Sequence, residues 1–405
     1  MTFEALGAGG SMAGRLGERG IREPTEVQRR AIPRLLGGED LLLASATGTG
    51  KTFAYLLPFL SRLLEAAQDG DSPALLIVAP TYELCSQIKG EVDFLLGAKN
   101  GPGRLSSLLL IGSAPLSRQI EGLRKRPVIV VGSPGRLLEL ARGGKLRTGR
   151  LRFLVLDEAD RLVSAELRAD TAALMRLTAG TAGDAGERSP EQPPRQTIAC
   201  SATLPPWSRE LLAPFVRGNP EAAFLECSGP EVLRRDIEHW ALFSESRRKI
   251  DTLRSFLAAA RPGRALVFTG RAEEAGRTLS RLQFRHIAAG GLWGDMDKSG
   301  RKQALEDLRR GRVRVLVTTD LAARGLDIEG LSHIIALDVP EEGDAYIHRA
   351  GRTGRAGKRG LMVSIGDAEE MRRLARLEKR LGITIYPKEL YGGKILAPEP
   401  FETGL

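Results

Sequence analysis

Short apolar runs recur along the first half of the chain, at residues 40–44, 74–79, 128–131, 153–156 and 197–200. Continuous apolar runs of this length are typical of strands that are buried on both faces of a parallel sheet. The stretches 53–68 and 84–96, which lie between such runs, are longer and amphipathic, and they predict helices. Strands and helices that alternate in this way predict an α/β domain.

The same pattern returns in the second half, with apolar runs at 265–269, 287–289, 313–318, 333–337 and 361–365. A length of 405 residues also exceeds what one hydrophobic core usually serves. We therefore expect two α/β domains, at 1–227 and 237–390, joined by a linker at 228–236 that begins with turn-forming residues. Residues 178–196 are polar and rich in glycine, which predicts a surface insertion, and residues 391–405 are expected to form an extended tail.

The composition favours a folded protein that binds a polyanion. Sixty Lys and Arg against fifty Asp and Glu give a net charge of +10, which favours nucleic acid ahead of a membrane surface, and 42% hydrophobic residues argue against disorder. The three cysteines, Cys85, Cys200 and Cys227, are too few and too scattered for a disulfide framework or a cysteine metal site, which indicates a reducing cytoplasm. The sequence has no apolar run of about 18 residues and no signal-peptide pattern, so we expect no membrane segment and no export.

A glycine-bearing loop connects the apolar run 40–44 to the helix predicted at 53–68. It consists of Ser45, Ala46, Thr47, Gly48, Thr49, Gly50, Lys51 and Thr52. Backbone N–H groups in such a loop point at phosphate oxygens, while Lys51 neutralises β- and γ-phosphate charge and the Thr52 hydroxyl binds Mg²⁺. Ser45 stands where a glycine usually opens this loop, and it is small enough to fit. A chance Gly-Lys-Thr at a helix start is the alternative, which the flanking strand and helix disfavour.

Two acidic residues follow the apolar run 153–156. Asp157 stands at the strand end where open α/β sheets bind ligands, and Glu158 comes next. We expect Asp157 to hold Mg²⁺ through its water shell, and Glu158 to orient and deprotonate the water that attacks the γ-phosphate. Two acids at a strand end can also form a solvated turn or a helix cap. The lysine loop upstream favours the nucleotide site.

The tetrad Asp157-Glu158-Ala159-Asp160, together with residues 20–28 upstream, resembles the DEAD-box RNA helicases of superfamily two. The resemblance covers nearly the whole chain and implies two tandem RecA-like parallel-sheet domains with the ATP site in the interdomain cleft. It also implies that Gln28 reads the adenine edge and that Phe3 packs beside the base. A side-chain amide can pair with a donor and an acceptor of adenine together, so ATP is expected rather than GTP.

Two further segments match motifs of this family. Ser201-Ala202-Thr203 resembles the motif that couples hydrolysis to strand separation, which assigns that coupling to Ser201 and Thr203. Residues 319–328 match the family's fifth motif, and the resemblance adds Gly325 and Asp327 to the nucleotide site.

Residues 346–355 match the family's sixth motif. By resemblance, Arg352 and Arg355 reach the γ-phosphate from the second domain, with Arg355 as the arginine finger, and His348 links the motif to the first domain. A guanidinium supplied in this way stabilises transition-state charge only when the two domains close. A generic basic patch is the alternative, but the glycines interleaved with these arginines indicate tight backbone turns.

The resemblance also supplies a set of RNA-contacting positions. They are Pro80, Thr81, Tyr82, Gly112, Pro134, Gly135, Arg136, Gly270, Arg271, Arg301, Thr318 and Arg324. Most offer small residues, backbone amides or hydroxyls, which contact phosphate and ribose, so we expect binding that is indifferent to sequence and sensitive to salt. Four residues depart from the family pattern: Tyr82, Ser113, Ser133 and Trp293. Tyr82 replaces an arginine, which predicts weaker RNA binding, and Trp293 is better explained as a core residue.

The resulting hypothesis is a monomeric, cytoplasmic, RNA-stimulated ATPase that opens short RNA duplexes by binding one strand in a bent form across both domains. A non-enzymatic RNA clamp on the same fold is one alternative, disfavoured because Lys51, Glu158, Arg352 and Arg355 are all present. A DNA-translocating helicase is the other, disfavoured by residues 20–28 and by the intact tetrad. The insertion 178–196 is a spacer or a docking site for a protein partner, and the target RNA is not predicted.

Overall fold

The computed structural model describes residues 2–46, 48–65, 73–97, 105–179, 194–227, 236–294, 296, 298–323, 328, 330–354 and 359–398. The chain divides into two compact units, residues 1–228 and 229–405. Most of the expected linker, most of the insertion and residues 399–405 of the expected tail lie outside the described ranges. No helix within those ranges is long and apolar enough to cross a membrane.

The described part of the first unit forms a seven-stranded parallel sheet in the order β3-β4-β2-β5-β6-β1-β7. The strands are β1 (Leu41–Ser45), β2 (Leu75–Val78), β3 (Ser107–Leu110), β4 (Ile129–Gly132), β5 (Phe153–Asp157), β6 (Gln196–Ser201) and β7 (Phe224–Cys227). The five inner strands coincide with the predicted apolar runs. The edge strands β3 and β7 were not predicted, because polar residues such as Ser107 and Glu226 interrupt their apolar character.

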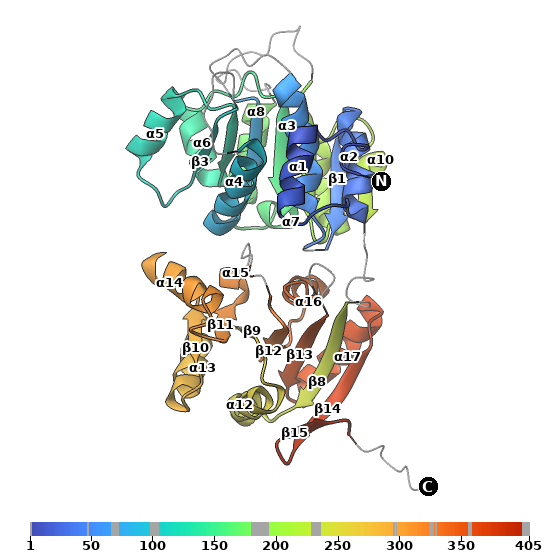
Figure 1. Cartoon of the computed structure of the whole chain (residues 1–405), viewed down its shortest axis with the longest axis vertical. Helices are drawn as coiled ribbons and strands as arrows, with labels where there is room; N and C mark the ends of the chain where they lie inside the picture. The colour runs from blue at the N-terminus through green and yellow to red at the C-terminus, as the bar shows by residue number, and fades with distance from the viewer. Residues whose placement is uncertain are drawn as a thin grey trace. The chain divides into compact units, whose positions relative to one another are not determined.

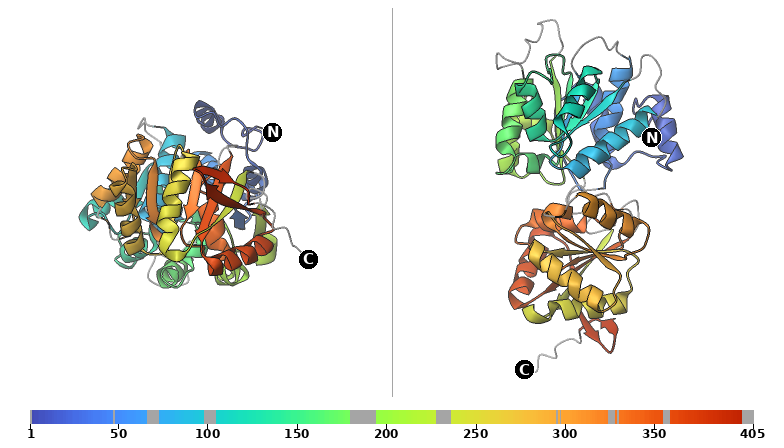
Figure 2. Two further views of the ribbon diagram at one scale, coloured as in Figure 1. Left: turned by 90° about the horizontal axis from the view of Figure 1, so that it is seen from below. Right: turned by 90° about the vertical axis from the view of Figure 1, so that its left-hand side faces the viewer.

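Helices cover both faces of this sheet (Figure 1; Figure 2, right). Successive residues of β1 alternate between two apolar clusters, with Leu41 and Leu43 in one and Leu42 in the other, as the pleat of a strand requires. The unit is therefore a three-layer α/β sandwich. Its helices are α1 (Gly10–Glu18), α2 (Glu26–Leu36), α3 (Lys51–Glu65), α4 (Tyr82–Leu96), α5 (Leu116–Arg124), α6 (Pro134–Arg142), α7 (Ala159–Leu162), α8 (Arg168–Thr178), α9 (Pro206–Leu212) and α10 (Pro220–Ala223).

The described part of the second unit forms an eight-stranded sheet in the order β10-β11-β9-β12-β13-β8-β14-β15, parallel except for β15. Its strands are β8 (Ile237–Phe243), β9 (Ala265–Thr269), β10 (Ala289–Leu292), β11 (Val315–Thr319), β12 (His333–Ala336), β13 (Gly360–Gly366), β14 (Ile385–Tyr391) and β15 (Lys394–Leu396). Its helices are α12 (Lys249–Ala260), α13 (Ala272–Phe284), α14 (Lys298–Arg309), α15 (Asp320–Ala323), α16 (Gly343–Ala350) and α17 (Ala368–Leu381). The predicted pair of parallel-sheet α/β domains is confirmed.

Two local predictions in the second unit were wrong. The strand expected at 287–289 lies at Ala289–Leu292, so it begins at the last residue of the predicted run and continues through two glycines. A Cβ at Gly291 would lie 2.3 Å from the Trp293 ring, so glycine is required there by close packing. The tail expected to be extended from residue 391 instead begins with a β14–β15 hairpin, whose turn is Gly392 and Gly393 at φ of 56° and 75°.

Candidate functional site

The loop that is predicted to bind phosphate joins the carboxyl end of β1 to the first turn of α3. Gly48 and Gly50 adopt φ of 80° and 91°, a region that favours glycine. Lys51 Nζ donates to the carbonyl oxygens of Ser45 and Ala46, at 2.5 and 2.8 Å. Burial lowers the pKa of Lys51, and the negative charge of Asp157 opposes that effect. The ammonium group must turn away from these carbonyls to meet a phosphate.

Asp157 ends β5 and is almost fully buried, at 4% exposure. Its Oδ2 accepts a hydrogen bond from Tyr55 Oη at 2.8 Å, and its Oδ1 accepts one from the Glu158 N–H at 2.9 Å. Burial raises the pKa of Asp157, while the charge of Lys51 and the Tyr55 hydrogen bond lower it. Tyr55 lies within the apolar helix α3, and sequence reasoning gave it no functional role.

Glu158 occupies the left-handed region, with φ of 50° and ψ of 52°, between β5 and α7. A non-glycine residue in that region is uncommon and stores strain where the surrounding structure enforces it. Its Oε2 is buried and has no hydrogen-bond partner among the described residues. A buried, unpartnered carboxylate oxygen is costly unless a ligand or water completes it. The geometry therefore fits a group that accepts a proton from a bound water.

The Ser201 hydroxyl at the end of β6 donates to Asp160 Oδ1 at 2.6 Å. This bond joins the predicted coupling motif to the acidic tetrad, because β5 and β6 are neighbours in the sheet. The Thr203 hydroxyl is buried without a partner among the described residues. The structure thus brings Ser201 to the acidic site.

Gln28 lies on the buried side of the first turn of α2 and is 1% exposed. Its Oε1 accepts from the Thr25 N–H at 2.9 Å within a capping box, and its Nε2 donates to the Gly50 carbonyl at 3.0 Å. The residue therefore lies against the phosphate loop, with its amide occupied by the protein. Phe3 is 2% exposed and belongs to the apolar core of the first unit, so its contact with a base stays a prediction.

The RNA-contacting candidates of the first unit follow β2, β3 and β4, on the opposite half of the sheet from β1, β5 and β6. Thr81 caps α4 by accepting from the Leu84 N–H at 3.2 Å, and Tyr82 is 46% exposed. Arg136 donates to the carbonyl oxygens of Gly112 and Ala114 at 3.0 and 3.4 Å, which joins the ends of β3 and β4. Pro80, Pro134 and Gly135 lie in the same strand ends or first helical turns. Sheet order thus separates the two sets of candidates.

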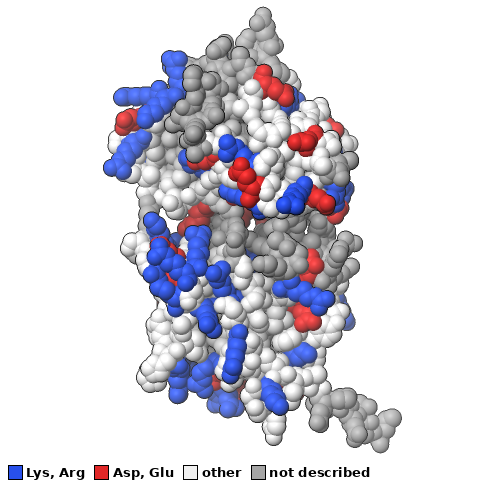
Figure 3. All heavy atoms as spheres, in the orientation of Figure 1, with Lys and Arg blue, Asp and Glu red and all other residues white. Residues whose placement is uncertain are grey.

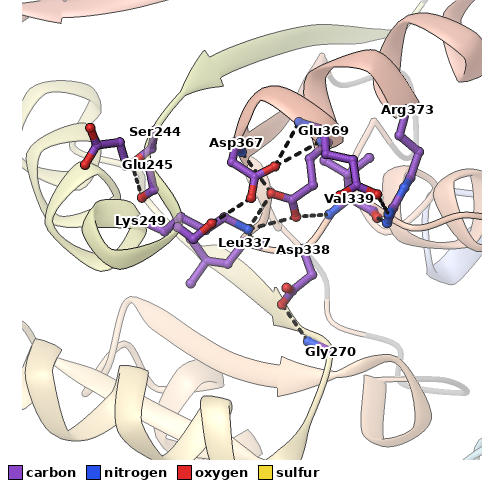
Figure 4. A network of polar contacts seen from close by, with 12 residues as sticks. Ser244, Glu245, Lys249, Gly270, Leu337, Asp338, Val339, Asp367, Glu369 and Arg373 are labelled. Carbon is purple, nitrogen blue, oxygen red and sulfur yellow. Dashed lines mark hydrogen bonds and ion pairs between the residues drawn. The ribbon is translucent and has the colours of Figure 1, made fainter.

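In the second unit, Arg349 connects the fifth and sixth motifs. It pairs with both carboxylate oxygens of Asp320 at 2.7 and 2.6 Å, and it donates to the Asp338 carbonyl at 2.5 Å. The Asp338 carboxylate in turn accepts from the Gly270 N–H at 2.7 Å (Figure 4). The end of β12 is also held by Lys249, which donates to the Leu337 carbonyl at 2.7 Å.

The other candidates of this unit have varied surroundings. Arg352 is buried and His348 half-buried at the end of α16, Arg271 precedes α13, and Thr318 is fully buried in β11. Arg301 on α14 donates to the Trp293 carbonyl at 3.3 Å, and Trp293 packs against an apolar cluster, as expected of a core residue. Five predicted residues lie outside the described ranges: Thr47, Arg324, Gly325, Asp327 and Arg355.

Sequence reasoning also missed Asp338 and Cys200, and it placed Asp320 in the fifth motif without giving it a role of its own. The Cys200 thiol lies 3.9 Å from Asp157 Oδ1 and 3.6 Å from the Leu156 carbonyl. No local signal marks Asp338 or Cys200, because each meets its partner only through the order of the strands. The described residues contain no cluster of three or more His, Cys, Asp or Glu suited to a metal ion.

Comparisons with known proteins cover both units. The family described as DEAD/DEAH box helicase matches residues 25–211, and the helicase conserved C-terminal domain matches residues 248–357. The DEAD-box ATP-dependent RNA helicase CshC of Bacillus cereus is 35% identical over 382 residues, which cover 94% of this chain and 92% of that protein. DEAD-box ATP-dependent RNA helicase 47, mitochondrial, of Arabidopsis thaliana is 34% identical, covering 98% and 79%. The structure of S. cerevisiae Dbp5 bound to RNA and ADP BeF3 is similar with a TM-score of 0.81, at 26% identity and 96% coverage of both chains.

Proposed function

This chain belongs to the DEAD-box ATP-dependent RNA helicases, and from that membership we propose that it couples RNA-stimulated ATP hydrolysis to local opening of short RNA duplexes or to remodelling of RNA–protein complexes. The observation that supports this most is the acidic pair at the end of β5. Asp157 is held there by Tyr55 within the electrostatic reach of Lys51, and Glu158 has a buried oxygen without a partner.

ATP binding begins at the loop between β1 and α3. Backbone N–H groups of the loop and of the first turn of α3 meet the phosphates, and Lys51 exchanges the carbonyls of Ser45 and Ala46 for the β- and γ-phosphate oxygens. Gln28, already against Gly50, exchanges its internal hydrogen bonds for the adenine edge.

A magnesium ion fits the donors that lie beside this loop. The Thr52 hydroxyl and the Asp157 carboxylate are hard oxygen ligands, and one carboxylate with phosphates and waters is the set that Mg²⁺ prefers. When bound, Mg²⁺ supplies positive charge that offsets the charge on the β- and γ-phosphates. Asp157 would hold it through water.

Hydrolysis itself depends on Glu158 and on the second unit. The Oε2 atom of Glu158 accepts a proton from the water that attacks the γ-phosphate, since this atom has no competing donor among the described residues. Arg352 and Arg355 supply positive charge to the transition state when the second unit closes on the first, with Arg355 as the finger and His348 joining the units. Gly325 and Asp327 complete the nucleotide contacts.

RNA binds along the ends of β2, β3 and β4 in the first unit and of β9, β10 and β11 in the second. The candidates there contact phosphate and ribose, so binding is indifferent to sequence. Ser201 is hydrogen-bonded to Asp160, and through this bond it couples the state of the nucleotide to the RNA-binding surface. The protein acts as a monomer in a reducing cytoplasm, and the three buried free thiols support the reducing compartment.

The Glu158→Gln variant tests the assignment of the base. RNA-stimulated ATP turnover should fall by at least about 10²-fold, while binding of a fluorescent ATP analogue persists, because the amide keeps the shape but cannot accept the proton. Glu210→Gln, the same change at an exposed site on α9, should leave turnover unchanged. Turnover at the wild-type rate in Glu158→Gln would show that Glu158 is not the base. Equal stimulation of ATP turnover by DNA and by RNA of the same sequence would favour the DNA-translocating alternative.

A further inference from the structure

A pocket of about 480 Å³ opens at the amino ends of β9, β10 and β11 in the second unit. Its walls come from α12, from the turn between α12 and β9, from the turn between α13 and β10, and from the residue before β11. The volume lies in the range of sites that hold small ligands or single side-chain anchors.

This pocket is distant from the residues assigned to RNA. Gly270 and Arg271 follow β9, and Thr318 lies near the end of β11, so these candidates stand at the carboxyl ends of the strands whose amino ends form the pocket. A strand of five residues spans about 16 Å. The pocket is therefore a separate feature of this unit.

The pocket combines an arginine rim with an apolar floor. The arginines of the lining are exposed or half-exposed and form its rim, and they are Arg254, Arg261, Arg285 and Arg314. The floor includes the buried Leu257 and Pro262 and the half-buried Ile287. Among the described residues that line the pocket, none is acidic. Arg254 has one ion pair, at 3.4 Å to the exposed Asp251, whereas the other three arginines pair with no carboxylate of the described residues. Figure 3 shows further Lys and Arg over α14, a helix that does not line the pocket.

Helix dipoles explain part of this charge but not its arrangement. Arg261 and Arg285 stand at the C-caps of α12 and α13, where a cation interacts favourably with the helix end. Arg314 precedes a strand and gains nothing from a helix dipole. Four arginines around one apolar hollow, with no acidic residue in the lining, are complementary to an anionic occupant.

We propose that this pocket binds a short segment of a protein partner that carries an apolar side chain flanked by Asp or Glu. The apolar side chain covers Leu257, Pro262 and Ile287, and the flanking carboxylates meet the rim, where a guanidinium can pair with both carboxylate oxygens. An unpaired RNA base fits less well. The lining contains no aromatic ring to stack on a base and, apart from Ser255, no side chain that accepts hydrogen bonds from its edges.

Selection from a displayed library of random heptapeptides tests the proposal on the full chain. Peptides are selected for binding to the wild-type protein, and those that also bind the Arg285→Glu/Arg314→Glu variant are discarded. The remaining peptides should combine Asp or Glu with Leu, Ile or Phe. In fluorescence polarisation these peptides should lose at least tenfold in affinity for the double variant. Arg277→Glu, an exposed change on α13 outside the pocket, should bind them as wild type does.

Both variants should show the RNA-stimulated ATP turnover of the wild type. That result would show that they are folded. Recovery of no peptide specific to wild type, or of peptides that lack acids or bind the double variant equally, would overturn the proposal. A tenfold loss of affinity for an unstructured 20-nucleotide RNA in the double variant, without acidic peptides, would assign the pocket to the RNA backbone instead.

Discussion

At the scale of single residues, Asp157 is positioned by side chains from other elements. Tyr55 on α3 donates to its Oδ2, and Cys200 on β6 lies beside its Oδ1. A buried carboxylate that loses a donor keeps its desolvation cost without the compensating bond. Tyr55 therefore acts as a positioning residue, and its hydroxyl is the part that matters.

The Tyr55→Phe variant should lose about 1–2 kcal/mol of unfolding free energy in the absence of nucleotide, because the Asp157 carboxylate loses one hydrogen bond inside the protein. Urea denaturation measures this change. Tyr82→Phe removes a hydroxyl from an exposed ring and serves as the control, with no expected change. Equal unfolding free energies of the two variants would show that the hydrogen bond from the Tyr55 hydroxyl contributes nothing to stability.

Tyr82 lies at the exposed start of α4, where the family resemblance expects an arginine. Tyr82→Arg should raise RNA affinity at low salt and steepen the dependence of log affinity on log salt by about 0.7, the value for one added phosphate contact on a single strand. Tyr391→Arg adds the same charge on the exposed β14–β15 hairpin and should not change the slope. An unchanged or lowered affinity of Tyr82→Arg would exclude a phosphate at this position.

At the scale of elements, α16 is fixed to α15 and to the end of β12 by one arginine. Arg349 is 3% exposed and makes three charge-assisted bonds, two to Asp320 and one to the Asp338 carbonyl. The Asp338 carboxylate also accepts a hydrogen bond from the Gly270 N–H (Figure 4). The sixth motif, the fifth motif and one predicted RNA contact therefore share a single network. Displacement of α16 would therefore disturb Gly270.

Arg349→Ala should destabilise the second unit by about 2–3 kcal/mol. This is less than the loss expected when one partner of a fully buried ion pair is removed, because the Asp320 side chain is 33% exposed. Chemical denaturation followed by circular dichroism measures the loss. Arg372→Ala removes an exposed arginine from α17 and provides the comparison, with a change close to zero. A loss below about 0.5 kcal/mol for Arg349→Ala would contradict the assignment of this network as a structural link.

At the scale of the whole molecule, each unit carries one part of the proposed reaction. The loop, the acidic pair and Gln28 belong to the first unit, and the arginines of the sixth motif belong to the second. Catalysis by such a pair of units requires that they meet during each turnover. On this proposal the arginines of the second unit act on the rate of hydrolysis rather than on the initial binding of ATP.

Arg355→Lys should lower RNA-stimulated kcat by about 10³-fold, because an ammonium group cannot replace the planar fork of an arginine finger, while binding of the ATP analogue stays close to wild type. Arg359→Lys makes the same change at an exposed residue of the second unit and should leave kcat unchanged. A kcat within threefold of wild type for Arg355→Lys would transfer the role of the finger to another residue.

The sequence by itself determined the class of fold and the places of the loop and of the acidic pair in it, and it predicted their chemistry. These depend on local patterns: apolar runs at strand length, a glycine loop between a strand and a helix, and acids at a strand end. Only the tertiary structure decided which residues support them. The contacts of Tyr55 with Asp157, Ser201 with Asp160 and Asp338 with Gly270 join residues 41 to 102 positions apart. Such contacts follow from the order of strands in each sheet. The combined burial of many side chains fixes that order, and no local sequence pattern specifies it.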